Sequence, residues 1–159
     1  KEAKYWEEDF LNINIIQDSF VKTKEIVNIC KQFTDDQYVD DKKEKALILG
    51  NAYDYLKANE HFEKNHFVET ILEKANDKEK LKEYITDYSK EKVDVNNFEI
   101  STNAIKEVKS KINKSTIKLD KTIEIKMTDM TTEKSDLIEK GFDPDKQMYF
   151  YKIYFNEES

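Results

Sequence analysis

The stretch QMYFYKIYF, residues Gln147–Phe155, has the composition of one long β-strand. Aromatic and β-branched side chains dominate it, and such residues fit a pleated surface that packs against neighbours. Successive strand residues point to opposite faces, so this segment offers apolar groups to both faces, which is typical of a strand inside a sheet. We therefore expect a partner strand on each side of it and a helical layer above it.

Three further strands are expected just before this segment. Apolar and polar residues alternate over 117–119 and 123–127, with Asp120-Lys121 as the turn between the two runs. A third strand is expected over 137–142. The following Asp143-Pro144-Asp145-Lys146 predicts a tight turn, because proline presets φ and the first aspartate can accept hydrogen bonds from the backbone that follows it. The prediction is an antiparallel β-meander of three to four strands.

The N-terminal two-thirds of the chain has a helical period instead, with apolar residues three and four positions apart. About four helices are expected: one over 19–34 capped by Asp18, one over 41–59, a short one after Asn65, and one that begins near Asn76. Gly50 lies inside the second helix at a cost of about 1 kcal/mol relative to alanine. We attribute it to the close approach of another helix.

A fifth helix is expected over 102–113, with Ser101 as its N-cap. It precedes the strands and is expected to cover their sheet. Because helices and strands are segregated along the chain, the fold class is α+β. The expected organisation is a helical region over 1–97 and a helix with an antiparallel sheet over 98–159, both packed as one domain.

The composition excludes several classes of protein. The chain of 159 residues has no arginine, a net charge of −7 and a single cysteine, Cys30, so it has no internal disulfide and fits a reducing cytoplasm. No apolar stretch approaches the ~20 residues of a membrane span. The sequence begins at Lys1 without a signal peptide, and we expect a fragment of a longer protein or a processed one.

The charge is unevenly distributed. Residues 1–100 contain 16 lysines against 23 acidic residues, whereas residues 101–159 contain 11 of each. Seven lysines and only three acidic residues lie within 104–126, which is the one basic segment. The acidic first part is expected to repel nucleic acid.

Several stretches resemble the bacterial 37-kDa nucleoid-associated protein family, also called NdpA-like. They are Ile138–Asp143, Met148–Phe155, Tyr5–Leu11, Lys45–Lys57, Phe98–Ser101 and Ile117–Asp120. The resemblance covers most of the chain, as roughly the C-terminal portion of the family's length. It implies a cytoplasmic bacterial protein that is associated with the nucleoid and with DNA and has no known catalysis. It identifies no DNA-contacting residue.

The basic segment itself indicates one candidate DNA-binding site, formed by Lys106, Lys109, Lys114, Lys118 and Lys121. Such lysines neutralise phosphates and make binding depend on salt. The alternative is a solvated face in a lysine-rich chain. A chain of net charge −7 without arginine also lacks the usual footprint of a DNA-binding domain, so the DNA contact is alternatively assigned to an N-terminal part outside this sequence.

A second functional class is a protein–protein interaction or oligomerisation module without direct DNA contact. Tyrosines are enriched in interfaces, and Tyr149, Tyr151 and Tyr154 would serve if the last strand lay at a sheet edge, where it can also pair with a second copy of the chain. The expected partners are therefore DNA and a homo-oligomer, and no membrane.

No catalytic residue, cofactor or metal is expected, and an enzyme with an unfamiliar site is the weakest of the three readings. Walker, GxGxxG, HExxH, CxxC and GxSxG motifs are all absent from the sequence. His61 and His66 are five residues apart, which does not match the i, i+4 spacing of a helical metal-ligand pair. Cys30 lies on an apolar helical stripe and is expected to be a small buried hydrophobe.

Overall fold

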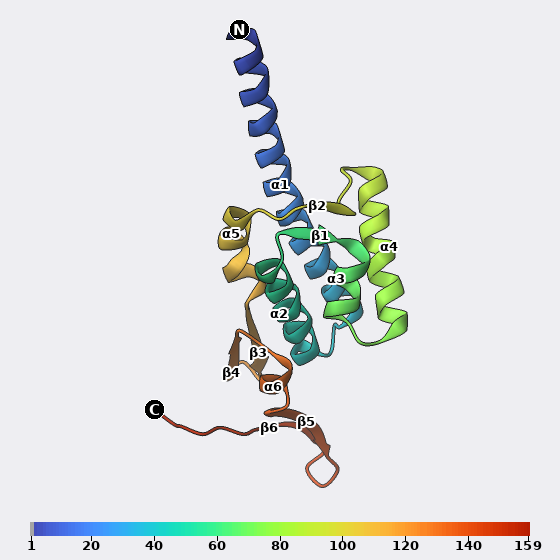
Figure 1. Cartoon of the computed structure of the whole chain (residues 1–159). Coiled ribbons are helices and arrows are strands. Elements are labelled where there is room, and N and C mark those ends of the chain that lie inside the picture. Colours follow the sequence, from blue (N-terminus) through green and yellow to red (C-terminus); the bar gives the residue numbers. More distant parts are fainter. Residues whose placement is uncertain (1) are drawn as a thin grey trace.

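The computed structural model describes the backbone of residues 2–159 and the side chains of residues 7–9 and 18–159. Helices come first and antiparallel strand pairs follow, which confirms the α+β class (Figure 1). The elements in chain order are α1 (Glu2–Gln37), α2 (Lys42–Ala58), β1 (His61–Glu63), α3 (Lys64–Ile71), α4 (Ala75–Glu91), β2 (Asn97–Glu99), α5 (Thr102–Ile112), β3 (Lys114–Leu119), β4 (Ile123–Thr128), α6 (Thr132–Ser135), β5 (Ile138–Asp143) and β6 (Met148–Ile153).

The first helix is longer than the sequence pattern predicted. The predicted N-cap at Asp18 is wrong, because α1 runs unbroken from Glu2 to Gln37. The Asp18 carboxylate lies 3.0 Å from the Lys22 ammonium one turn later, an i, i+4 pair that stabilises a helix rather than starting one. The residues before Asp18 include no glycine or proline that would stop the helix. The N-terminal turns of α1 extend past the other helices (Figure 1).

The caps of the later helices show which start signals operate. Asp41 caps α2 by accepting from the backbone N–H of Glu44 at 3.0 Å, and Ser101 caps α5 as predicted. Glu63 caps α3 with both carboxylate oxygens, and these backbone hydrogen bonds lower the pKa of Glu63. In contrast, α4 begins at Ala75, one residue before the expected position, without a side-chain cap.

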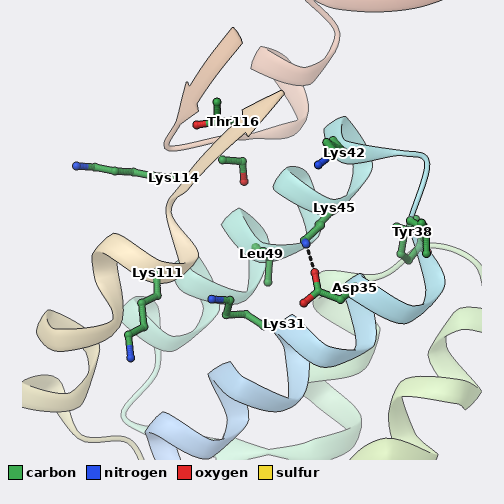
Figure 2. A pocket seen from close by; sticks show the side chains of 11 residues that line it. Lys31, Asp35, Tyr38, Lys42, Lys45, Leu49, Lys111, Lys114 and Thr116 are labelled. Atoms are coloured by element: carbon green, nitrogen blue, oxygen red, sulfur yellow. Dashed lines mark hydrogen bonds and ion pairs between the residues drawn. The ribbon is translucent and has the colours of Figure 1, made fainter. Parts of the chain in front are cut away.

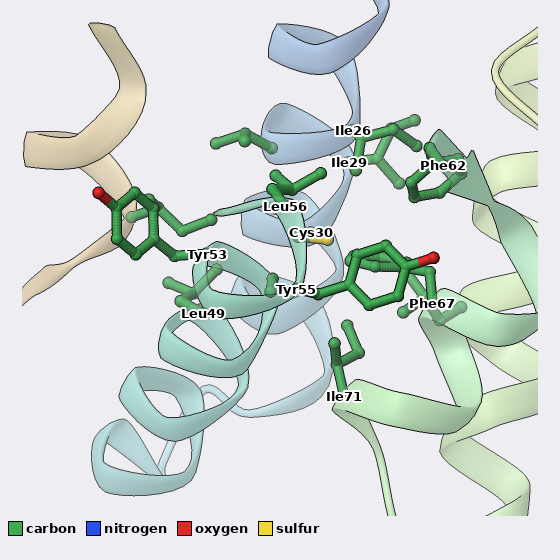
Figure 3. Close-up of a cluster of buried hydrophobic side chains, with 14 of the residues drawn as sticks. Ile26, Ile29, Cys30, Leu49, Tyr53, Tyr55, Leu56, Phe62, Phe67 and Ile71 are labelled. Carbon is green, nitrogen blue, oxygen red and sulfur yellow. The ribbon is translucent and has the colours of Figure 1, made fainter. Parts of the chain in front are cut away.

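The main core lies between the helices (Figure 3). Its fully buried side chains come from α1 through α5 and from the short β1–β2 pair, and they include Ile26, Phe33, Leu56, Phe62, Phe67, Val68, Leu81, Ile85 and Ile112. Helix α5 packs its apolar stripe against α1 and α2. The expectation that it covers the sheet is therefore wrong, because the partners of that stripe are helices.

The strands form separate two-stranded antiparallel pairs within residues 2–159: β1 with β2, β3 with β4, and β5 with β6. The succession of antiparallel strands expected over 117–155 is present, but β4 and β5 do not pair because α6 and its flanking turns lie between them. The central position expected for the last strand is wrong, since β6 pairs with β5 alone in the described chain. The β1–β2 pair has three residues per strand, which is too few for an alternation of apolar and polar residues to predict these strands from the sequence.

A second, smaller core attaches the C-terminal hairpins to α2. It contains Ala46 of α2 and four residues from the last third of the chain, Ile117, Met127, Met130 and Ile138. The Lys43 ammonium also donates to the Ile138 carbonyl at 2.5 Å. Both predicted turns are confirmed: Asp120 and Lys121 adopt positive φ, and the Asp143 carboxylate accepts from two backbone N–H groups at 2.9 and 3.1 Å.

Candidate nucleic-acid interface

The junction between α5 and β3 positions the predicted lysines. Asn113 ends α5 and is buried; its side-chain amide donates to the Asp129 carboxylate, and its carbonyl accepts from the Asp129 backbone N–H at 3.1 Å. This pair of contacts holds the end of β4 against the end of α5. The lysines on either side of Asn113 therefore project from a fixed backbone.

Three of the five predicted lysines lie together. Lys106, Lys109 and Lys114 are exposed and line one pocket of about 420 Å³ beside Asp129. The other two, Lys118 and Lys121, lie farther along the β3–β4 hairpin, where Lys118 is 3.9 Å from Glu124 and Lys121 occupies the turn. The structure therefore groups the first three and separates the last two from them.

Asp129 offsets part of the positive charge in this pocket. The hydrogen bond from Asn113 lowers the pKa of the Asp129 carboxyl, and the charges of Lys134, Lys109 and Lys57 act in the same direction. The carboxylate is therefore anionic at neutral pH and faces the same space as the predicted lysines. An incoming phosphate meets repulsion here as well as attraction.

A more cationic pocket shares Lys114 with the first one (Figure 2). It has a volume of about 390 Å³ and brings together lysines from four elements: Lys31 of α1, Lys42 and Lys45 of α2, Lys111 of α5 and Lys114 of β3. Its one acidic residue, Asp35, pairs with Lys45. Among the described side chains, the other four lysines form no ion pair.

The two pockets share Lys114. Their lysines are together called the lysine surface: Lys31, Lys42, Lys45, Lys106, Lys109, Lys111 and Lys114. In Figure 2 the side chains of Lys111 and Lys114 extend outward from the junction, whereas Lys45 turns toward Asp35. The lysines from α1 and α2 were missed because they belong to the acidic first part of the sequence. Only the packing of α1 and α2 against α5 places them here.

The remaining candidates have structural partners. His61 contacts the Asn97 side chain, and His66 Nδ1 lies 3.1 Å from the Tyr55 hydroxyl. No group of three histidine, cysteine or acidic side chains in the described residues has the arrangement of a metal site. Over the same residues, no helix combines the length and hydropathy that crossing a bilayer requires.

Cys30 is expected to be inert toward thiol reagents in the folded protein. It is 1% exposed, and burial raises its pKa to about 12, so the thiolate fraction at pH 8 is only about 10⁻⁴. Titration with a chromogenic disulfide reagent at pH 8 should detect no fast-reacting thiol in native protein and one thiol per chain in denaturant. Rapid modification of the native protein would contradict this burial.

The comparison with protein-family models agrees with the resemblance noted in the sequence. No curated protein and no solved structure gives a significant match to this chain. The model of the family described as nucleoid-associated protein YejK matches residues 1–149, nearly the whole chain. The chain therefore belongs to the nucleoid-associated protein YejK family.

Proposed function

We propose that this chain is a non-enzymatic, DNA-associated protein of the bacterial nucleoid and cytoplasm, and that it contacts the DNA backbone through the lysine surface. The observation that carries the proposal is the pocket in which four lysines have no ion pair among the described side chains. An ammonium group without an ion-pair partner among the described side chains can donate to a phosphate oxygen, and such charge-assisted hydrogen bonds are strong. Contacts to phosphate oxygens carry no information about the bases, so the proposed contact is independent of sequence.

The net charge of −7 does not prevent such binding. At physiological ionic strength the screening length is about 8 Å, so a phosphate at the lysine surface interacts mainly with the charges that lie nearest to it. The acidic remainder of the molecule weakens attraction at long range. We therefore expect modest affinity that falls steeply as salt is added.

We propose that the protein catalyses no reaction at the lysine surface. The pockets beside the lysine surface are lined by lysines, hydroxyl residues and single aspartates, and within the described residues neither pairs a nucleophile with a histidine base. Such a lining suits the binding of an anion and offers no evident acid–base pair.

The lysine surface is expected to determine the salt dependence of DNA binding. A variant with glutamine at Lys31, Lys42, Lys111 and Lys114 should bind a duplex less tightly, and the slope of log affinity against log salt should decrease in magnitude by about 3.6, since each phosphate contact contributes about 0.9. Fluorescence anisotropy of a labelled duplex between 50 and 200 mM salt measures both effects.

The matched control removes the same number of charges from α4 and its C-cap residue, Lys92. Glutamine at Lys80, Lys82, Lys90 and Lys92 changes the net charge equally and leaves the lysine surface intact. This control should retain most of the wild-type slope. Equal losses in the two variants, or no binding by the wild-type protein at 50 mM salt, would refute the proposed contact.

A second candidate function, a protein interface, is favoured by the C-terminal hairpin. The hairpin and the two residues that follow it expose seven apolar side chains: Phe142, Met148, Tyr149, Phe150, Ile153, Tyr154 and Phe155. Their exposed fractions run from 45% to 73%, and they occur on both faces of the strands. Groups of exposed aromatic and aliphatic side chains are typical of interaction sites. We propose that this hairpin is an oligomerisation surface, and a second copy of the chain is the partner considered below.

A further inference from the structure

The outer edge of β6 has a definite set of backbone groups available for pairing. The Tyr154 N–H donates to the Leu137 carbonyl at 2.8 Å, which shows that its backbone faces β5. Backbone groups alternate along an antiparallel strand, so those of Phe150 and Lys152 also face β5, and those of Tyr149, Tyr151 and Ile153 face outward. Within residues 2–159 no strand pairs with this outer edge.

This edge also lacks the usual protection against pairing. Natural edge strands carry prolines, bulges or several charges, whereas β6 has an unbroken register with β5 and one charged residue, Lys152. The hairpin lies at the end of the molecule opposite the N-terminus, away from α4 (Figure 1). An isolated two-stranded hairpin is marginally stable, and two hairpins joined edge to edge form a four-stranded sheet.

Building on the oligomerisation surface proposed above, we propose that β6 pairs antiparallel with β6 of a second copy, about a two-fold axis at Tyr151. The axis sets Tyr151 opposite Tyr151 of the partner subunit and Tyr149 opposite Ile153 of the partner subunit. These are the outward-facing residues, so about six backbone hydrogen bonds form. A two-fold pairing of one strand with itself is the isologous contact that closes a dimer.

The charge of Lys152 favours this register over the two registers shifted by two residues. The register centred on Tyr151 sets Lys152 opposite Phe150 of the partner subunit, where the ammonium can lie against an aromatic ring. A shift by two residues toward the C-terminus would instead set Lys152 opposite Lys152 of the partner subunit, and two like charges would face each other. A shift in the other direction moves Ile153 opposite Gln147 of the partner subunit, outside the strand, and loses apolar contact.

Apolar side chains flank the proposed contact. Met148, Tyr149, Phe150 and Ile153 of β6 are exposed, and successive strand residues alternate between the two faces of the sheet. Pairing at the edge sets these side chains beside those of β6 in the second copy, so they lose part of their exposure.

Cysteine cross-linking tests the register directly. In Tyr151→Cys the two new cysteines face each other across the axis, with Cα atoms about 5.5 Å apart, which a disulfide spans. In the matched control Tyr149→Cys, the two cysteines lie four residues apart along the strands, on the order of 14 Å, beyond the reach of a disulfide. The buried native Cys30 does not compete. Mild oxidation and a non-reducing gel should show a covalent dimer for Tyr151→Cys alone.

Light scattering of the unmodified chain supplies the second measurement. We expect a dimer whose mass decreases on dilution, and a monomer for the double variant Tyr149→Pro, Ile153→Pro, which removes outward N–H groups and spares the bonds to β5. A dimer without the Tyr151→Cys cross-link would refute the strand pairing and leave the oligomerisation surface standing. A monomer at all concentrations would refute both.

Discussion

Replacing Phe62 by alanine is expected to lower the free energy of unfolding by about 3–5 kcal/mol. The Phe62 side chain is fully buried at the centre of an aromatic cluster. Its ring stacks on Phe98 with centroids 4.8 Å apart and lies 4.9 Å from Phe67 and 6.2 Å from Tyr55. Alanine would leave a cavity and also remove these ring contacts, each worth about 0.5–1.5 kcal/mol.

The matched control is Phe155→Ala, because Phe155 is 68% exposed and lies beyond the end of β6. Its effect on a monomer should be within about 0.5 kcal/mol, and urea unfolding followed by circular dichroism measures both variants. A Phe62→Ala cost below about 1 kcal/mol would mean that the aromatic cluster does not stabilise the fold.

We also propose that residues 1–97 and 98–159 unfold in one transition, since α5 packs against α1 and α2.

Replacing Gly50 by alanine is expected to destabilise the protein, although alanine is the better helix former. A Cβ at Gly50 would lie 2.2 Å from the Met130 carbonyl oxygen and 3.2 Å from its carbon. These are backbone atoms in the segment after β4, so they move only if that segment shifts. The gain in helix propensity is about 1 kcal/mol, and overpacking costs about 1–3 kcal/mol. We expect a net loss of up to about 2 kcal/mol.

The control for this prediction is Asp54→Ala, an exposed position in the same helix. It should change the free energy of unfolding by no more than about 0.5 kcal/mol. If Gly50→Ala were instead stabilising, the segment at Met130 would not rest against α2. The neighbour at Gly50 also corrects the expectation from sequence, which was another helix; it is the backbone that follows β4.

The sequence alone was sufficient for features that depend on short-range chemistry. The helical period located α2 and α5, and Ser101 forms the N-cap of α5 as predicted. Proline and aspartate located the turn at Asp143, and the family follows from residues spread over most of the chain. The helix period, the N-cap and the turn each depend on residues a few positions apart. The family resemblance depends on the sequence itself and not on how the chain packs.

Tertiary structure alone decided the features that join distant segments. An apolar strand such as β6 has the same sequence pattern whether it has one neighbouring strand or two. Its position at the edge of a two-stranded pair was therefore not predictable from the sequence. Lys31 and Lys42 were hidden in a segment whose summed charge is negative, and only the packing of α1 and α2 places them beside Lys111 and Lys114. Local patterns specify which elements form, because propensity and capping are local. Where charges and edges meet depends on packing between segments far apart in the sequence.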